Sequence, residues 1–424
     1  MKIKKVKSSY REVLNIPAQK AAKPKKPNIL FRTVLKIASL PDMIFTGFKV
    51  KKNGIDRLSK NEPCLYLMNH SSFIDLEIAA SVLYPRPFNI VCTADTMIGK
   101  NWLMKQLGCI PTKKFIFDMA LVRELVYVTK TLKSSVLMYP EACYSFDGTS
   151  TVLPESLCKF VKLLGVPVVM IETHGAFLRD PLYNNLQKRK VKVSAEMTYI
   201  LSPDEIKEKT PEEINEILKD CFSFDNFRYQ RENGIRVKEK FRADFLNRTL
   251  YRCPHCNSEG KTEGRGTELA CKSCGATYEL TEYGALLRKD GEAAFDHIPD
   301  WYRWERECVR KELESGSYLL DIPVDICILK DTKCLYEVGE GRLIHNADGF
   351  ELKGCNGELE YSQTPLSSYS LNADYYWYEL GDIICIGDHK MLYYCFPKTE
   401  GDVVAKTRLA TEELYKMCKE RVKQ

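Results

Sequence analysis

The sequence lacks any run of about 18 or more apolar residues, the length that a membrane-spanning helix requires. It also lacks a secretory signal, because its basic start is not followed by an apolar core and a small-residue cleavage site. We therefore expect no membrane-spanning helix and a reducing, cytosolic compartment. The 17 cysteines agree with this, since their number is odd and several stand singly in apolar runs, where a reduced cysteine acts as a small hydrophobe.

The sequence has no internal repeat and no extreme of composition. Hydrophobic residues make up 44% and charged residues 28% of the 424 positions, which is ordinary for a folded protein of two or three domains. The net charge of +6 is mildly basic and fits contact with phosphates, anionic lipid or nucleic acid without choosing among them. No dense basic stripe appears, so we do not expect nucleic-acid binding.

The N-terminal segment is the most basic part of the chain. Residues 1–27 hold a single acid, Glu12, and an apolar and aromatic segment follows over residues 29–48. Such an arm and segment are typical of a surface anchor on anionic lipid, and equally of a flexible tail before a core helix. The first reading places the protein peripherally on the inner face of the cell membrane. The basic residues are Lys2, Lys4, Lys5, Lys7, Arg11, Lys20, Lys23, Lys25 and Lys26.

Residues 28–240 alternate strand-like and helix-like segments, which predicts an α/β domain of layered sheet and helices. The expected strands are short apolar runs, and the expected helices have apolar residues at helical spacing. The strands are predicted over residues 64–68, 89–92, 135–139, 166–171 and 191–201, and the helices over 74–83, 120–132, 154–164 and 211–222.

A histidine and an aspartate, His70 and Asp75, follow the first of these buried strands. If the turn enters a helix, Asp75 lies about one helical turn from His70 and can hold one ring nitrogen by a hydrogen bond. The other nitrogen is then free to take a proton from a hydroxyl, as in the Ser-His-Asp triad, with the substrate supplying the hydroxyl. The spacing by itself is equally that of a capping aspartate beside an incidental histidine.

Four blocks in order resemble the glycerolipid acyltransferases, the family of acyl-CoA or acyl-carrier-protein:lysophosphatidate acyltransferases. They cover about residues 60–175, and the combination is more specific than any one block. The blocks are Asn69-His70 with Asp75, then Gly108-Cys109-Ile110-Pro111-Thr112-Lys113-Lys114, then Tyr139-Pro140-Glu141-Ala142-Cys143-Tyr144-Ser145, and last Val166-Pro167-Val168-Val169.

The resemblance implies roles for individual residues. His70 is the expected general base and Asp75 its orienting partner. Glu141 is expected to shape the acceptor site, and Lys113 or Lys114 to contact an acceptor phosphate or headgroup. Asn69 and Tyr144 complete the residues predicted to bind substrate. Alternatively, Glu141 is a structural carboxylate and the two lysines form a solvated charge pair.

The third block departs from the family pattern, in which Gly-Thr-Arg follows the glutamate. Here Ala142, Cys143 and Tyr144 stand at those positions, so the arginine that would grip a phosphate with two parallel hydrogen bonds is missing. The second block ends in Lys114 instead of arginine, a point charge without the fork. These departures favour a lysophospholipid, a glycolipid or another lipid alcohol as much as lysophosphatidate.

Two Cys-x-x-Cys pairs mark a separate module. Cys253 and Cys256 are followed after fourteen residues by Cys271 and Cys274. Each pair can bind one metal ion from a tight turn, which is the signature of a zinc ribbon. Because four thiolates close the coordination shell, the predicted zinc is structural, and no other cofactor is expected. The alternative is four ordinary cysteines.

The region after the ribbon is rich in short strand-like segments and ends in an amphipathic helix. Strands followed by one C-terminal helix resemble, in architecture alone, a pleckstrin-homology or GRAM-type barrel that binds a headgroup or a protein; a barrel with no ligand fits equally. The predicted organisation is a basic arm (1–27), an acyltransferase domain (28–240), a zinc ribbon (248–290) and a β-rich domain (315–424).

The resemblance implies a peripheral membrane enzyme of phospholipid biosynthesis or remodelling. It would move a fatty acyl group from acyl-CoA or acyl carrier protein to the hydroxyl of a lysophospholipid or related lipid acceptor. The alternative, suggested by the altered third block, is a lipid-binding or scaffolding protein that keeps the fold without turnover. A third hypothesis, a nucleic-acid-associated protein built on the ribbon, is not favoured.

Overall fold

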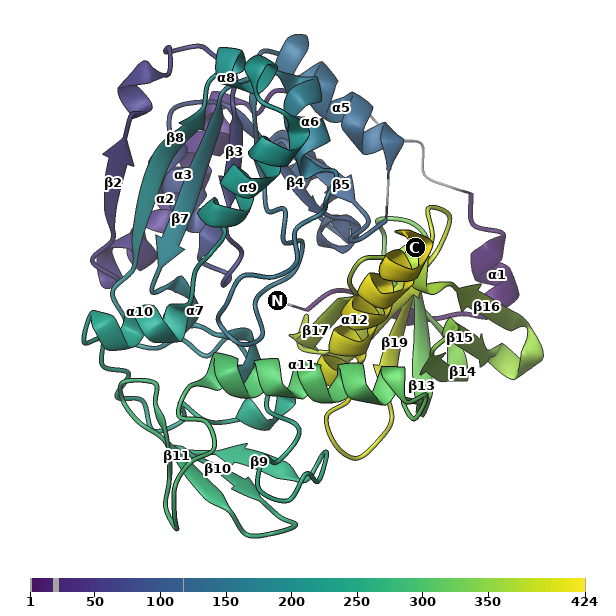
Figure 1. Cartoon of the computed structure of the whole chain (residues 1–424). Coiled ribbons are helices and arrows are strands. Elements are labelled where there is room, and N and C mark those ends of the chain that lie inside the picture. The colour runs from purple at the N-terminus through teal and green to yellow at the C-terminus, as the bar shows by residue number, and fades with distance from the viewer. Residues whose placement is uncertain (1, 18–22, 117, 424) are drawn as a thin grey trace.

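The computed structural model describes residues 2–17, 23–116 and 118–423, so Lys20 of the predicted basic arm lies outside the described residues. Three sheets organise the chain (Figure 1): a seven-stranded mixed sheet, a four-stranded antiparallel sheet and an eight-stranded sheet. The order of the three along the chain confirms an α/β unit followed by a cysteine-marked module and a β-rich region.

The seven-stranded sheet forms the α/β unit and has the order β2-β8-β7-β3-β6-β4-β5. Every neighbouring pair is parallel except β7 and β8. Since β3 and β6 are parallel neighbours, their carboxyl ends meet at one edge of the sheet. The strands are β2 (Lys49–Asn53), β3 (Leu65–Met68), β4 (Phe88–Thr93), β5 (Cys109–Thr112), β6 (Ser135–Met138), β7 (Val168–His174) and β8 (Ser194–Leu201).

Helices cover both faces of this sheet, which explains why β3 is buried at every position. Leu65 and Leu67 belong to the apolar core beneath α5, α6, α8 and α9, whereas Tyr66 and Met68 belong to the core on the α2 and α3 side. The helices are α2 (Ile29–Phe45), α3 (Asp75–Leu83), α4 (Asn101–Gln106), α5 (Met119–Lys130), α6 (Leu157–Leu164), α7 (Ala176–Arg179), α8 (Pro203–Glu208), α9 (Pro211–Cys221) and α10 (Asn226–Glu232).

Some segments of the α/β unit differ from the sequence-based expectation. The helix predicted from Pro154 begins only at Leu157, so the proline precedes the helix instead of opening it. The edge strands β2 and β5 are not among the predicted strands; β5 lies in the second block and pairs with β4 in parallel.

The cysteine-marked module is a four-stranded antiparallel sheet of order β12-β11-β10-β9. Helix α11 (Ile298–Glu314) follows it and leads to the β-rich region (Figure 1). The strands are β9 (Thr262–Arg265), β10 (Glu268–Cys271), β11 (Thr277–Leu280) and β12 (Leu286–Arg288).

The β-rich region is confirmed as a sheet of order β16-β15-β14-β13-β19-β18-β17, followed by α12 (Val404–Lys423), which packs against α11. Two of its strands are longer than the short runs in the sequence suggested, because β13 and β14 each join two predicted strands. The strands are β13 (Leu320–Leu329), β14 (Leu335–Asn346), β15 (Gly349–Gly354), β16 (Leu359–Gln363), β17 (Asn372–Trp377), β18 (Gly381–Gly387) and β19 (Leu392–Pro397).

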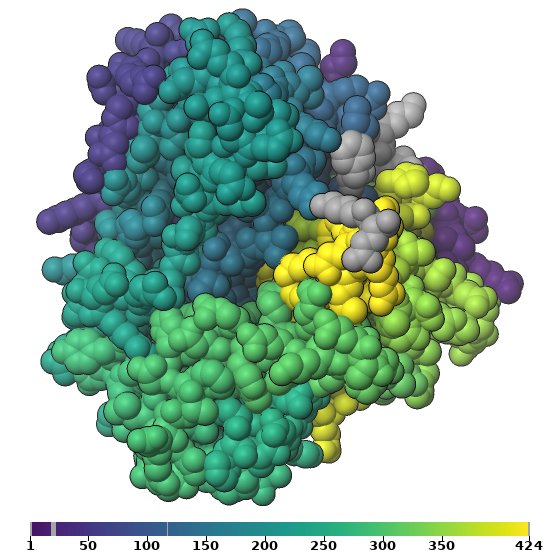
Figure 2. Space-filling view, in the orientation of Figure 1, coloured from purple at the N-terminus to yellow at the C-terminus, as the bar shows by residue number. Residues whose placement is uncertain are grey.

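One continuous apolar core joins the three parts of the chain. It includes Phe146 and Phe177 of the α/β unit, Tyr278 of the four-stranded sheet, Trp301 of α11 and Leu409 of α12. In the space-filling view the C-terminal residues lie directly against the α/β unit (Figure 2). The parts are therefore packed together and are not separate units on flexible linkers.

The predicted basic arm is folded over part of its length, which differs from the flexible tail that was one of the two alternatives. Strand β1 (Lys5–Lys7) pairs in parallel with β14, and the Lys5 ammonium lies 2.8 Å from the Glu337 carboxylate. Helix α1 (Tyr10–Leu14) follows, capped by Ser9, and buries Val13 in the shared core. Backbone pairing and one buried side chain thus attach the basic arm to the C-terminal sheet.

Helix α2 buries one side and exposes the other. Ser39 and Met43 are buried on the α3 side, whereas several large apolar side chains face outward, among them Ile44 and Phe45. Within the part of the chain that the structure describes, no helix combines the length and apolar character needed to cross a membrane.

We expect Val13→Ala to lower the free energy of unfolding by about 2 kcal/mol, because a fully buried side chain leaves a cavity in the shared core. Leu14→Ala, next to it but 43% exposed, should change it by less than about 0.5 kcal/mol. Urea unfolding of both variants checks this. Equal, small effects would mean that residues 5–14 are not attached to the C-terminal sheet.

Candidate active site

The turn after β3 brings His70 and Asp75 into contact. The imidazole Nδ1 lies 3.0 Å from the Asp75 Oδ2. Asp75 is the first residue of α3, so the turn does enter a helix. Because the carboxylate faces Nδ1, this nitrogen carries the proton in the neutral imidazole, and Nε2 is left as the acceptor. The His70 side chain is 21% exposed while that of Asp75 is 1% exposed.

Asp75 is held in place by the backbone of the same turn. Its Oδ2 accepts hydrogen bonds from the N–H groups of Ser71, at 2.8 Å, and Ser72, at 3.1 Å. These bonds fix the carboxylate in one position. A fixed Asp75 carboxylate can orient His70 and stabilise the imidazolium that forms when His70 takes a proton.

Two tyrosine rings flank the His70 imidazole. The ring centroids of Tyr139 and Tyr144 lie 4.3 Å and 4.2 Å from that of His70. Burial, together with the nearby Asp75 charge, raises the pKa of both phenols well above the usual value, so both stay protonated. Tyr144 was predicted from the third block to bind substrate; the sequence reasoning gave Tyr139 no role, although it begins the same block.

Glu141 is buried and bridges two segments of the site. One carboxylate oxygen accepts the backbone N–H of His70 at 3.0 Å, and the other accepts that of Thr151 at 2.6 Å. Burial raises the pKa of Glu141 to about 7, although these hydrogen bonds lower it in part. The carboxylate therefore fixes the backbone on both sides of the site, and both of its oxygens are engaged within the protein.

The structure places Asn69 in the interior and not at the predicted substrate contact. Its side chain is fully buried. The amide oxygen accepts the backbone N–H and the hydroxyl of Thr173, and the amide nitrogen donates to the Thr173 carbonyl and the Ser71 hydroxyl. Both ends of the amide are thus used to join the ends of β3 and β7, so Asn69 positions its neighbour His70 instead of facing a substrate.

The two lysines of the second block face the β-rich region. The Lys113 ammonium donates to the carbonyls of Asp388 and His389, and burial lowers its pKa. Lys114 lies 3.8 Å from the Cys143 thiol. Burial alone would lower the pKa of Lys114, but Cys143 and the carboxylates Asp374 and Asp95 raise it. Neither lysine forms the solvated charge pair that we considered.

The β-rich region also contributes groups that sequence reasoning missed. Arg408 of α12 is buried, and its Nη1 lies 3.4 Å from the Tyr144 carbonyl oxygen. Asp374 of β17 faces Lys114, and burial raises the pKa of this carboxyl to about 7. Arg408 follows Tyr144 by 264 positions, and no pattern in the sequence links the two residues.

The four predicted metal-ligand cysteines come together in the ribbon. The sulfur atoms of Cys253, Cys256, Cys271 and Cys274 all lie within 4.8 Å of one another. The Cys253–Cys274 and Cys256–Cys271 sulfur distances are 3.8 Å and 3.7 Å. Four sulfurs around one zinc at the usual bond length of about 2.3 Å stand about 3.8 Å apart, so the cluster fits a tetrahedral zinc site.

Comparison with known proteins agrees with the four blocks. Residues 49–172 match the family model described as Acyltransferase. A chloroplastic 1-acyl-sn-glycerol-3-phosphate acyltransferase of Brassica napus is 27% identical over 135 residues, which is 31% of this chain and 39% of that relative's length. The crystal structure of the 1-acyl-sn-glycerophosphate acyltransferase PlsC from Thermotoga maritima aligns at 16% identity and a TM-score of 0.35 over 45% of this chain and 76% of that one.

The family match spans β2 to β7 and so includes the strand ends that carry His70, Asp75 and Glu141. The resemblance predicted from the four blocks is confirmed. Over residues 49–172 the chain is thus similar to the Acyltransferase family, and both relatives named above are 1-acylglycerophosphate acyltransferases.

Proposed function

We propose that the protein transfers a fatty acyl group from acyl-CoA or acyl carrier protein to the hydroxyl of a lysophospholipid or related lipid. The observation that carries this is the His70–Asp75 pair, in contact at 3.0 Å inside an acyltransferase domain. The partly exposed imidazole leaves Nε2 to meet a substrate hydroxyl, while the buried carboxylate fixes the ring.

In this reaction His70 Nε2 takes the proton of the acceptor hydroxyl as the oxygen attacks the thioester carbonyl carbon. The new C–O bond gives a tetrahedral intermediate, and Asp75 stabilises the imidazolium. When the C–S bond breaks, the imidazolium returns the proton to the departing thiolate. The products are an ester and a free thiol, and no redox or metal step is needed.

For the acceptor we propose a lysophospholipid or related lipid alcohol, with lysophosphatidate as one member of the class. The third block supplies no arginine, Lys113 donates to carbonyls of the β-rich region, and Lys114 lies beside the Cys143 thiol. Two groups are assigned to the acceptor side of the imidazole: Tyr144, whose ring packs against His70, and the turn that Glu141 holds.

We also propose that the protein binds peripherally to the inner face of the cell membrane through α2. Its outward apolar residues lie on one side of the helix, and the opposite side packs against α3, so the apolar side is available to meet a lipid surface. Trp102 of α4 is 67% exposed and packs on Phe31, which extends this face. We name it the α2 face; its α2 members are Leu30, Val34, Ile37, Leu40, Ile44 and Phe45.

For the ribbon and the β-rich domain we propose a structural zinc held by the four cysteine thiolates and a pleckstrin-homology or GRAM-like module. The near-tetrahedral sulfur spacing supports the first. Antiparallel strands followed by the single helix α12 support the second.

His70→Ala should reduce acyl transfer by at least about 100-fold, because the general base is lost. The assay follows a labelled acyl group from acyl-CoA or acyl carrier protein to a panel of lysophospholipid, glycolipid and other lipid acceptors. Asp75→Asn should also reduce transfer, since the amide no longer holds the productive tautomer.

The matched control is His389→Ala, which removes an exposed imidazole in the β-rich region and should transfer at the wild-type rate. Folding of each variant is verified by circular dichroism. If folded wild-type protein transfers to no acceptor, the catalytic proposal fails and a lipid-binding scaffold takes its place.

Ile44→Glu should weaken binding to vesicles of phosphatidylglycerol and phosphatidylcholine roughly tenfold or more, because a charge replaces an apolar contact with the lipid. Val422→Glu is the matched control, since both side chains are 75% exposed but Val422 lies at the end of α12, outside the α2 face. Co-sedimentation measures the bound fraction. Equal loss in both variants, or no binding by the wild type, argues against the α2 face.

The purified protein should contain one zinc per chain by elemental analysis, and Cys253→Ser should abolish this binding. Chelation should lower the melting temperature by roughly 10 °C or more, because the metal supplies folding energy in a small module. Cys418→Ser, outside the cluster, is the control and should keep its zinc. A metal-free protein with an unchanged melting temperature would contradict the assignment.

A further inference from the structure

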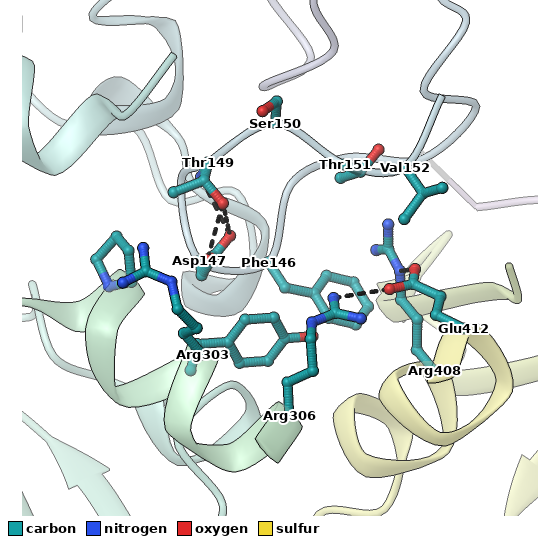
Figure 3. A pocket seen from close by; sticks show the side chains of 12 residues that line it. Phe146, Asp147, Thr149, Ser150, Thr151, Val152, Arg303, Arg306, Arg408 and Glu412 are labelled. Atoms are coloured by element: carbon teal, nitrogen blue, oxygen red, sulfur yellow. Dashed lines mark hydrogen bonds and ion pairs between the residues drawn. The ribbon is translucent and has the colours of Figure 1, made fainter. Parts of the chain in front are cut away.

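A cavity of about 260 Å³ lies between the acyltransferase domain and the two C-terminal helices (Figure 3). One wall is the loop that follows the third block, from Phe146 to Val152. The opposite wall is formed by α11 and α12, whose side chains point toward the loop. This volume is below the roughly 300–1,000 Å³ of pockets that enclose drug-sized ligands, so it suits a small polar group and not an acyl chain.

Three guanidinium groups line this cavity: Arg303 and Arg306 from α11, and Arg408 from α12. Arg408 is almost completely buried, and its guanidinium stacks on the Phe146 ring at 4.6 Å. The hydroxyl-bearing residues Thr149, Ser150 and Thr151 line the facing loop. Planar guanidinium groups and hydroxyls together are the donors that recognise phosphate oxygens.

The two carboxylates that line the cavity are already engaged. The Glu412 carboxylate forms ion pairs with Arg306 at 2.7 Å and Arg408 at 3.3 Å, and it accepts a hydrogen bond from the Ser370 hydroxyl at 2.6 Å. Asp147 accepts the backbone N–H and the hydroxyl of Thr149, at 3.1 Å and 2.9 Å. Arg303 also pairs with Asp300 of its own helix, and Arg306 with Glu413. With Asp300 and Glu413 included, four carboxylates surround the three arginines, so recognition of a phosphate here rests on the N–H donors of the guanidinium groups and not on an excess of positive charge.

Two residues of the third block link the cavity to His70. The Glu141 carboxylate holds the backbone N–H of His70 with one oxygen and that of Thr151, which lines the cavity, with the other. The second link is Tyr144, whose ring packs against His70 while its carbonyl faces Arg408. A molecule bound in the cavity therefore lies beside the turn that carries His70.

The second-block lysines, which we expected to contact a phosphate, have partners within the protein. Lys113 donates to carbonyls of the β-rich region, and Lys114 lies 3.8 Å from the Cys143 thiol. The third block has Tyr144 where the family pattern has arginine. Arg408, from a helix outside the matched residues 49–172, reaches the backbone of this same position.

We propose that this arginine cavity binds a phosphate group of one of the two substrates of acyl transfer. The inference rests on the proposed acyltransferase function and adds the site of anion recognition. The shared chemistry is a phosphate monoester or diester. Its source is either the headgroup of the acceptor or the nucleotide part of the acyl carrier, and the two are distinguished by choice of probe.

Binding of inorganic phosphate, sn-glycerol 3-phosphate, coenzyme A and 3′-dephospho-coenzyme A is measured by calorimetry on the full chain. Arg303→Gln removes a lining cation, and Ser150→Asp adds a carboxylate to the facing loop. Each should weaken binding of the phosphate probes at least tenfold. Lys311→Gln removes the same charge from an exposed position of α11 outside the cavity and should stay within twofold of wild type.

Tight binding of glycerol 3-phosphate, with a raised KM for phosphate-bearing acceptors in the two variants, supports the acceptor headgroup. If the wild type binds coenzyme A more tightly than 3′-dephospho-coenzyme A and the variants bind the two equally, the phosphate belongs to the acyl carrier. Repeating the titrations on His70→Ala separates this inference from the proposed function, because binding does not need turnover. No binding of any probe, or equal binding by folded variants and wild type, overturns the proposal.

Discussion

The Glu141 carboxylate is the interaction on which the arrangement of the site depends. It follows β6, whereas His70 follows the neighbouring strand β3, and only a short buried acceptor between them can satisfy the backbone N–H groups of His70 and Thr151 together. Burial raises its pKa to about 7, so this link carries an electrostatic cost that the two hydrogen bonds offset in part. The imidazole on one side and the loop lining the arginine cavity on the other are thereby held in one geometry.

The β-rich region takes part in this geometry and is not an appendage. Its carbonyls bind Lys113, its Asp374 faces Lys114, and Arg408 supports the Tyr144 backbone beside His70. Buried charges require partners, and here the partners of the acyltransferase domain come from β17, α12 and the loop after β18. The parallel pairing of β1 with β14 attaches the N-terminal segment to the same sheet.

Much of the α/β unit could be predicted from the sequence because its strands are short apolar runs and its helices have regular apolar spacing. The predicted strand over residues 64–68 and helix over 74–83 are β3 and α3 to within a residue. The prediction failed where local pattern carries no information. Strand β1 is a basic tripeptide whose partner lies more than 300 positions away.

The His70–Asp75 pair and the two Cys-x-x-Cys pairs were predictable from the sequence, because a short turn sets the distance between residues that are close in the chain. The groups that surround them depend on tertiary packing. Asn69 turned inward to Thr173, Lys113 and Lys114 turned to the β-rich region, and Arg306 and Arg408 met the loop after the third block. These contacts join residues about 100 to 280 positions apart, and such pairs are selected by packing and charge compensation in the folded core and not by any local pattern.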